Sequence, residues 1–497
     1  MDYLIYIVGS GAVVGFLLGY LYCWSKRDLF ALLIWLGAGA SAAGGPLESV
    51  QAATADAKRL TPGIAYGTRY LDLGNLTPPE RAELVASVSF WANATSVEAE
   101  IVRPRRVGPE LIAIYLPDYG AGKLEVWERF AESDPYFHEK LQVVAGGNVL
   151  SFHRAGKDWR PGMYTTKAAV ATTFIVPTRS MQQTELAILT NSASPILRAD
   201  WWQSQVAVQA DRKVGYYDWL GVGRKRGDFE RVVGLDRVAA QRVRKEVAAI
   251  VSESVVALHN RHVYRYGTLT GAYWETRDAK ANDGERNALR LLNGDYRHDA
   301  EEIIATLPNG LHGFFLSDAA GARADTAPDF IASDGRSTSP DRRVHAALSC
   351  VRCHVEGIRP IGCWFRRAYA APDNLAVLDP TRAVRLRQLY ASDLDRITRR
   401  DQDDYAGAVK SANGLTVGDN AKVVAAVWSR YLDQPVGLES AATELGCTPE
   451  RLVAVIRMQQ QPDPVLFALG KQKALPVRRE HWEEIYQVAW KMIVEAQ

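Results

Sequence analysis

The stretch LSCVRCHVEGIRP, residues 348–360, decides how the surrounding part of this 497-residue chain must fold. Within it, Cys350-Val351-Arg352-Cys353-His354 has the C-x-x-C-H spacing of a covalent c-type haem attachment site. Two thiols three residues apart lie on one helical turn, so each can form a thioether with one haem vinyl group. The next residue, His354, can then present its imidazole to the iron as the proximal ligand. The motif therefore predicts one haem c, bound through Cys350, Cys353 and His354.

Zinc is the main alternative explanation of this motif. With 5 Cys and 9 His in 497 residues, random placement would give the motif only about 0.001 times, so chance does not explain it. A zinc site would use Cys350, Cys353, His354 and Cys363, but adjacent Cys353 and His354 would bind one ion awkwardly. A dithiol redox site would need a thioredoxin-like βαβ context, which the sequence lacks. Haem is favoured over both.

The residues around the motif suit a haem site. Ser339-Pro340-Asp341 has the N-cap, first-turn proline and acidic residue of a helix start, so we expect a helix from Asp341 to about His354. Downstream, we expect the Pro360 carbonyl to orient His354 through its second ring nitrogen. Arg352, together with Arg342 and Arg343, could pair with the haem propionates or form a solvated helix face.

The second axial position of the iron has several candidates. His298, which precedes a predicted hairpin, is our first choice as the second metal ligand, and His312 is the second. A purely structural role for His298 stays open. His345 would share a helix with the motif, so it could not reach the opposite face of the haem. Met458 and Met492 lie more than 100 residues downstream on amphipathic patterns, where methionine usually fills a core.

The N-terminus predicts export from the cytoplasm. Residues 3–24 carry no charge and would span about 33 Å as a helix, enough to cross a bilayer. After the polar break at 25–28, residues 29–45 resemble the apolar part of a signal peptide, with small-residue cleavage sites at 40–42 or 50–52. A membrane hairpin, a cleaved signal peptide and a buried cytosolic hairpin are all compatible with this pattern. The first two place the rest of the chain in the periplasm or another extracytoplasmic space, with the membrane as a partner in the anchored case.

Composition excludes several classes of protein. Lys and Arg total 59 and Asp and Glu 57, so the net charge of +2 argues against a nucleic-acid binder with a basic surface. The mean hydropathy of −0.16 excludes a polytopic membrane protein. Five cysteines are too few for a disulfide scaffold of this length.

Hydrophobic periodicity predicts an α+β fold. The expected elements are helices within 53–98, at 124–137, at 228–256 and throughout 380–497, strands at 111–120 and 169–178, and a hairpin at 301–318 around Asn309-Gly310. We therefore expect a mixed α/β body, a β-hairpin next to a helical cytochrome c-like haem-binding region, and an all-helical C-terminal part. The corresponding divisions are 1–52 for the membrane or signal segment, 53–260 for the α+β body, 261–370 for the hairpin and haem-binding region, and 371–497 for the helical end.

The chain resembles a family of exported bacterial proteins that carry a single C-x-x-C-H motif. The matching stretches are Arg69-Tyr70-Leu71, Asp118-Tyr119-Gly120, Arg198-Ala199-Asp200-Trp201, Gly271-Ala272-Tyr273-Trp274, His298 through Leu311, Ala327-Pro328, Ala332-Ser333-Asp334, Ser349 through His354 and Ala441 through Gly446. The resemblance implies export and haem binding, and it includes His298 as a recurring histidine. A second histidine of that pattern is replaced here by Tyr266. The resemblance supplies no reaction.

Three functions follow as hypotheses. The first is a monohaem c-type cytochrome that transfers single electrons to or from a redox partner protein. The second is a peroxidase-like haem enzyme with an open sixth coordination site, because a body of about 440 residues is more than one haem needs. The third is a non-redox module in which the motif holds zinc.

Overall fold

The computed structural model describes most of the chain from Pro46 onward. The described residues are 46–74, 76–136, 143–145, 148–155, 158–164, 185–209, 213–242, 247–251, 257–288, 296–329, 331–333, 344–354, 356–361, 380–381, 384, 394–471 and 475–495. Residues 1–45, the greater part of the predicted export segment, lie outside them, as does the predicted strand at 169–178. Within these ranges no helix combines the length and the apolar character needed to cross a membrane. Residues 46–497 form one compact unit.

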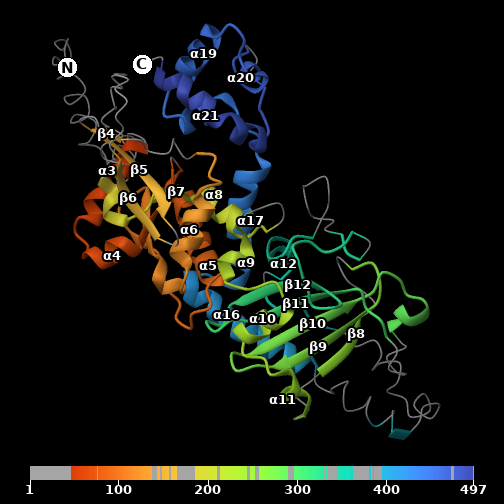
Figure 1. Ribbon diagram of the computed structural model, residues 1–497. Coiled ribbons are helices and arrows are strands. Elements are labelled where there is room, and N and C mark those ends of the chain that lie inside the picture. Colours follow the sequence, from red (N-terminus) through yellow and green to blue (C-terminus); the bar gives the residue numbers. More distant parts are fainter. Residues whose placement is uncertain are drawn as a thin grey trace, which may run out of the picture. The chain divides into compact units, whose positions relative to one another are not determined.

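A four-stranded sheet forms the first part of this unit, in the strand order β2-β3-β1-β7. Its edge strand β7 is labelled in Figure 1. Its strands are β1 (Thr68–Asp72), β2 (Arg105–Arg106), β3 (Leu111–Tyr115) and β7 (Ile196–Arg198). β1 runs parallel to β7 and antiparallel to β3. Tyr70 and Ala113 on one face pack with Ala53 of α3 (Pro46–Ala57), which begins inside the segment 1–52 that we assigned to the N-terminal signal. The opposite face contributes Leu71 to the main apolar core, which it shares with α5 (Pro78–Ala94) and α8 (Ala199–Val206).

A larger antiparallel sheet has the strand order β13-β12-β11-β10-β9-β8. Its strands are β8 (Val247–Val251), β9 (Arg261–Gly267), β10 (Ala272–Asp278), β11 (Ala300–Thr306), β12 (His312–Asp318) and β13 (Arg323–Ala324). The predicted hairpin is confirmed, because β11 pairs with β12 from Ala300↔Asp318 to Thr306↔His312. Gly310 in the connecting turn has φ +85°, a conformation that favours glycine.

The two faces of this sheet are covered by different helices. On the face we call the α10 face, Phe229 of α10 (Arg226–Val232) stacks on Phe315, with ring centroids 5.4 Å apart. On the other face, the α16 face, Trp274 and Ile304 pack with Ile358 and with Leu394 at the start of α16 (Leu394–Asn413). Side chains alternate between the two faces along each strand. The register therefore shows on which face, the α10 face or the α16 face, each strand residue lies.

Helix α16 connects the two sheets. Near its start, Asp401 accepts hydrogen bonds from Trp274 Nε1 (2.8 Å) and from the guanidinium of Arg265 (2.7 and 2.8 Å), both on the α16 face. Near its end, the Ala412 carbonyl accepts a hydrogen bond from Ser89 Oγ of α5 at 2.7 Å. Helix α16 is therefore bound both to the larger sheet and to α5.

The remaining elements complete a mixed α+β architecture with a helical C-terminal part. The part of the chain before β11 adds α4 (Pro62–Gly67), η1 (Leu116–Tyr119), α6 (Lys123–Ala131), α9 (Tyr216–Leu220), α11 (Arg237–Arg242), η2 (Gly284–Arg286) and a three-stranded sheet of β4 (Val143–Ala145), β5 (Asn148–Ala155) and β6 (Asp158–Tyr164). The C-terminal half adds α12 (Leu348–Cys353), α17 (Val417–Trp428), η4 (Ser429–Asp433), α18 (Leu438–Glu444), α19 (Pro449–Met458), α20 (Pro464–Leu469) and α21 (Arg479–Glu495).

The predicted long helix at 228–256 is wrong. α10 ends at Val232, Gly234 adopts φ +66°, and α11 covers only Arg237–Arg242. The apolar run that follows forms β8, which pairs with β9 as an edge strand of the larger sheet. A short run of Val, Ala and Ile suits a strand or a helix, and here pairing with β9 determines the outcome.

Threonine N-caps begin two of the C-terminal helices. In α19, Thr448 Oγ1 accepts a hydrogen bond from the Arg451 backbone amide at 3.2 Å, and Pro449 occupies the first turn. We expect Thr448→Ala to lower the free energy of unfolding by about 1 kcal/mol, because one amide of the first turn loses its partner. Urea unfolding followed by circular dichroism measures the change, and Thr448→Ser, which keeps the acceptor, is the control. Equal stability of the alanine and serine variants would contradict the prediction.

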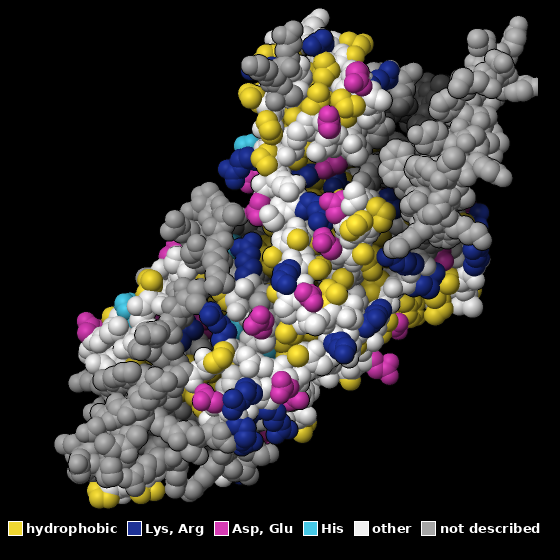
Figure 2. Space-filling view, turned by 180° about the vertical axis from the view of Figure 1, so that it is seen from behind, with side chains coloured by type: hydrophobic (Ala, Val, Ile, Leu, Met, Phe, Trp, Pro, Cys, Tyr) yellow, Lys and Arg dark blue, Asp and Glu magenta, His cyan; other side chains and the backbone are white. Residues whose placement is uncertain are grey.

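Charged side chains of both signs are interspersed over the face of the molecule seen in Figure 2. Lys and Arg alternate there with Asp and Glu, in keeping with the near balance of 59 basic and 57 acidic residues. The predicted absence of a nucleic-acid partner stays a prediction.

Candidate functional site

The motif cysteines lie on the short helix α12. Cys350 and Cys353 are half-buried, whereas Leu348 and Val351 of the same helix are buried in the main core. Cys350 also packs against that core. The core therefore holds the helix through its apolar residues, while the cysteine that precedes the motif histidine stays partly accessible beside a cavity.

Helix α12 begins later than the sequence predicts. We expect a start at Asp341, but residues 334–343 lie outside the described part and the helix begins at Leu348. Just before it, His345 forms an isolated antiparallel bridge with Thr326, and Ala347 has φ +64°. Residues 344–347 therefore do not form the predicted helix, and His345 does not share a helix with the motif.

His354 follows the helix directly, and a backbone contact fixes its orientation. Its Nδ1 lies 3.2 Å from the Gly357 carbonyl oxygen, which can only accept a hydrogen bond. The proton is therefore on Nδ1, and Nε2 carries the lone pair that a metal requires. A backbone carbonyl that orients a histidine ligand in this way is common beside metal centres. The carbonyl is that of Gly357, not the predicted one of Pro360.

Gly357 is suited to this role in two ways. Its φ of +94° lies in the left-handed region, which side chains other than glycine rarely adopt. A Cβ atom added there would lie 3.1 Å from the Tyr405 ring of α16. The close approach of α16 thus requires a glycine three residues after the motif histidine.

A cavity of about 270 Å³ adjoins the motif. Its lining residues are Arg352, Cys353, Glu356, Gly357, Arg359, Pro360 and Gln402. The Arg352 guanidinium also lies over the Trp428 ring, 5.6 Å from its centroid. Cys353, Pro360 and Arg352, three of the residues singled out in the sequence, therefore share one cavity, although Pro360 contributes to its wall rather than to the histidine bond. Arg342 and Arg343 lie outside the described residues.

The cavity and His354 belong to the α16 face of the larger sheet. Ile358, four residues after His354, packs there with Trp274 and Val263. Burial lowers the pKa of His354 to about 4, while its bond to Gly357 and the nearby charge of Glu302 act in the opposite direction. The imidazole is therefore neutral at physiological pH, which is the form that binds metals.

His312 also lies on this face. It is opposite Thr306 in the β11–β12 register, so it shares the face of Ile304 and Glu302. The side chain is only 4% exposed, and its Nδ1 is buried without a hydrogen-bond partner. Burial, followed by the neighbouring His354, lowers the pKa of His312 to about 3.

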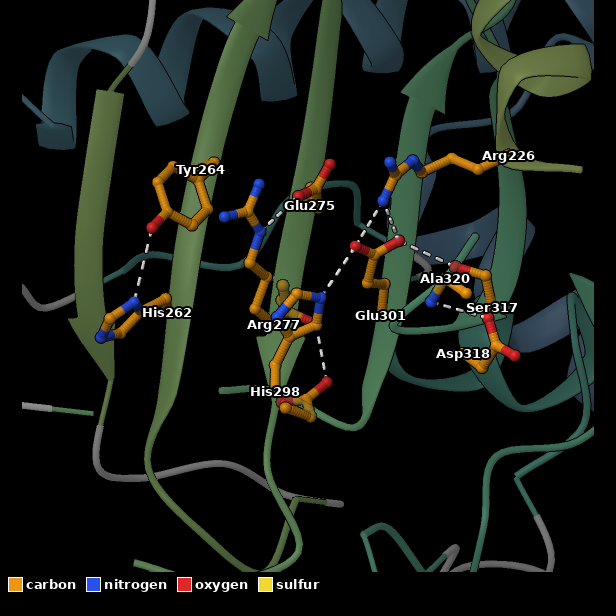
Figure 3. A network of polar contacts seen from close by, with 12 residues as sticks. Arg226, His262, Tyr264, Glu275, Arg277, His298, Glu301, Ser317, Asp318 and Ala320 are labelled. Atoms are coloured by element: carbon orange, nitrogen blue, oxygen red, sulfur yellow. Dashed lines mark hydrogen bonds and ion pairs between the residues drawn. The ribbon is translucent and has the colours of Figure 1, made fainter. Parts of the chain in front are cut away.

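His298 lies on the opposite face of the sheet, as part of the network in Figure 3. Its Nε2 is 3.0 Å from Glu301 Oε1, and Glu301 also pairs with Arg226 of α10 and accepts a hydrogen bond from Ser317 Oγ at 2.8 Å. Glu301 and Ser317 are cross-strand partners on the α10 face. The structure therefore does not bring His298, our first choice as second metal ligand, to the side of the sheet that holds His354.

The described part of the structure adds no support for the zinc alternative. Among the residues that the structure describes, no three His, Cys, Asp or Glu side chains form a group able to hold a metal ion. Cys363, the fourth residue of that alternative, lies outside the described ranges. Cys350, Cys353 and His354 thus follow one another along the chain without surrounding a common point.

A second polar cavity, of about 390 Å³, lies in another part of the molecule. It lies beside Asp72 and Arg198, at the carboxyl ends of the parallel strands β1 and β7. Arg198 pairs with Asp200 at 2.7 Å and with Glu444 of α18 at 2.9 Å, and Glu444 also pairs with Arg479 of α21 at 2.8 Å. Because these charges satisfy one another, they connect the first sheet to the C-terminal helices. Arg198, Asp200 and Glu444 belong to two of the stretches quoted for the family resemblance, but their wide separation in sequence gave no sign that they meet.

No family model, curated protein or solved structure matches this chain. The function is therefore inferred from the chemistry of the residues around α12.

Proposed function

We propose that the protein is an exported monohaem c-type cytochrome that transfers single electrons. Cys350 and Cys353 would form the two thioethers, and His354 would be the proximal ligand. The observation that carries the proposal is the 3.2 Å contact between His354 Nδ1 and the Gly357 carbonyl. It leaves Nε2 of a neutral histidine for iron, directly after two cysteines spaced for haem attachment.

The residues around the motif fit such a group. The cavity beside Cys353 offers the guanidiniums of Arg352 and Arg359, which are suitable donors for haem propionates. Bound haem would supply a one-electron ferric–ferrous couple. The chain would contribute the fixed orientation of His354, the neutral state of its imidazole, and the apolar packing of Ile358 against the sheet, which limits access of water on that side.

Export follows from the same proposal, because haem c is attached outside the cytoplasm in bacteria. The N-terminal segment would deliver the body to the periplasm or another extracytoplasmic space, and it would anchor the chain to the inner membrane if it is retained. The partner would be a second redox protein, and no nucleic acid would be involved.

The test is the pyridine haemochrome spectrum of the full-length chain, produced together with a c-type haem maturation system. We expect a c-type spectrum with one haem per chain, and haem that stays with the polypeptide after acid–acetone extraction, since thioethers survive this treatment. Elemental analysis of the same sample is expected to find iron and no stoichiometric zinc. Colourless protein, or one zinc ion per chain, would overturn the proposal.

A further inference from the structure

His312 is a buried histidine whose present surroundings do not satisfy it. Buried polar atoms in folded proteins nearly always have hydrogen-bond partners, and each exception requires an explanation. The Nδ1 of His312 is such an exception, in a side chain that is 4% exposed. Leaving this buried ring nitrogen unpaired destabilises the folded state. A metal ion bound to Nδ1 itself would satisfy it.

The sheet register directs His312 toward the motif. Its cross-strand partner Thr306 alternates along β11 with Ile304, which packs on the α16 face. The same face carries Ile358, just after the motif. His312 and the loop that follows His354 therefore meet the sheet from the same side.

Tyr405 of α16 contacts both of these segments. The His312 ring stacks on the Tyr405 ring with centroids 4.0 Å apart and an interplanar angle of 16°. The Tyr405 ring also approaches Gly357, whose carbonyl orients His354. His312, through its ring, and His354, through the carbonyl that orients it, are therefore both linked to Tyr405.

We propose that His312, through its unpaired Nδ1, is the second axial ligand of the haem iron. The inference rests on the proposed function, because it requires a haem at Cys350 and Cys353. Two histidine ligands would make the iron six-coordinate and low-spin, and they would close it to small molecules. Such a site suits electron transfer and excludes the peroxidase-like alternative, which needs an open coordination position.

The experiment compares the full-length, haem-loaded protein with its His312→Ala variant. The wild type is expected to be low-spin in both oxidation states and not to bind CO, with the electron paramagnetic resonance and near-infrared signature of two histidine ligands. His312→Ala is expected to become high-spin and to bind one CO per haem when reduced, and added imidazole is expected to restore the low-spin spectrum. His298→Ala, which removes the histidine on the α10 face, is the control and is expected to stay low-spin.

The possible outcomes separate this inference from the proposed function. A pyridine haemochrome spectrum of each sample shows whether haem is attached, and its absence from the wild type would overturn both. A wild-type protein that contains haem but is high-spin, binds CO or carries the near-infrared signature of a methionine ligand would overturn only the role of His312. A low-spin His312→Ala variant would do the same. If that variant does not fold, the near-infrared signature of the wild type decides alone.

Discussion

Replacing both Cys350 and Cys353 with serine is expected to abolish covalent haem attachment. A thioether needs a thiol to add to the haem vinyl group, and a serine hydroxyl does not replace it. Because both cysteines lie on α12 at half-buried positions, a change from sulfur to oxygen disturbs the packing of Leu348 and Val351 little. We expect in-gel haem staining after denaturation to fall from one haem per chain to none, the largest effect that any substitution in this protein should have.

Matched variants distinguish loss of attachment from loss of folding. Cys447 is also half-buried, but it lies between α18 and α19 in the helical C-terminal part, so Cys447→Ser is expected to keep full haem content. The single variants Cys350→Ser and Cys353→Ser should each retain one thioether, with the red-shifted haemochrome band of a haem that keeps one vinyl group. Circular dichroism checks that the double variant is folded. Covalent haem at the wild-type level in that variant would refute the assignment of the two thiols.

The parts of the fold that follow from the sequence are those with local signals. Pro78 and Pro79 are typical of a helix start, and α5 does begin at Pro78. The Thr77 backbone amide donates a hydrogen bond there to the Glu80 carboxylate at 2.9 Å, as in a capping box. Asn309-Gly310 predicts the hairpin of β11 and β12, because such turns require positive φ. The start at Leu348 could not be predicted, since it depends on pairing between His345 and Thr326, which are distant in sequence.

The candidate site, too, could be predicted only where its residues are close together in sequence. The two thiols and His354 are adjacent in sequence, so their spacing alone predicts their joint role. The choice between His298 and His312 depends on which helix covers each face of a sheet, and periodicity does not contain that information. Glu301 and Glu302 illustrate this point, since neighbours in one strand belong to opposite faces, one facing Arg226 of α10 and the other close to His354. The register and the position of α16 place His312, and not His298, on the side of the sheet that holds His354.

The network around Glu301 predicts an acid-sensitive contribution to stability. Burial alone would raise the pKa of Glu301, but hydrogen bonds from His298, Arg226 and Ser317 and the charge of Arg226 outweigh it and lower the pKa to about 2, from an ordinary value of 4.5. Each pKa unit corresponds to about 1.4 kcal/mol, so the ionised carboxylate stabilises the folded state by about 3 kcal/mol. Because the folded pKa is depressed, this contribution is complete above pH 4.5 and disappears as the pH falls toward 2.

Glu301→Gln is therefore expected to lower the free energy of unfolding by about 3 kcal/mol at pH 7, and the deficit should shrink steadily below pH 4.5. The glutamine keeps the shape of the side chain, but among the described residues it leaves the half-buried guanidinium of Arg226 with Glu230, at 3.2 Å, as its ion-pair partner. Urea midpoints measured from pH 7 to pH 3 test this, with the exposed Glu484 of α21 changed to glutamine as control. A deficit that is the same at all these pH values would show that packing, not charge, accounts for the loss. Unchanged haem content in Glu301→Gln would agree with its position on the α10 face, because the sheet separates this network from the side on which His312 and His354 meet.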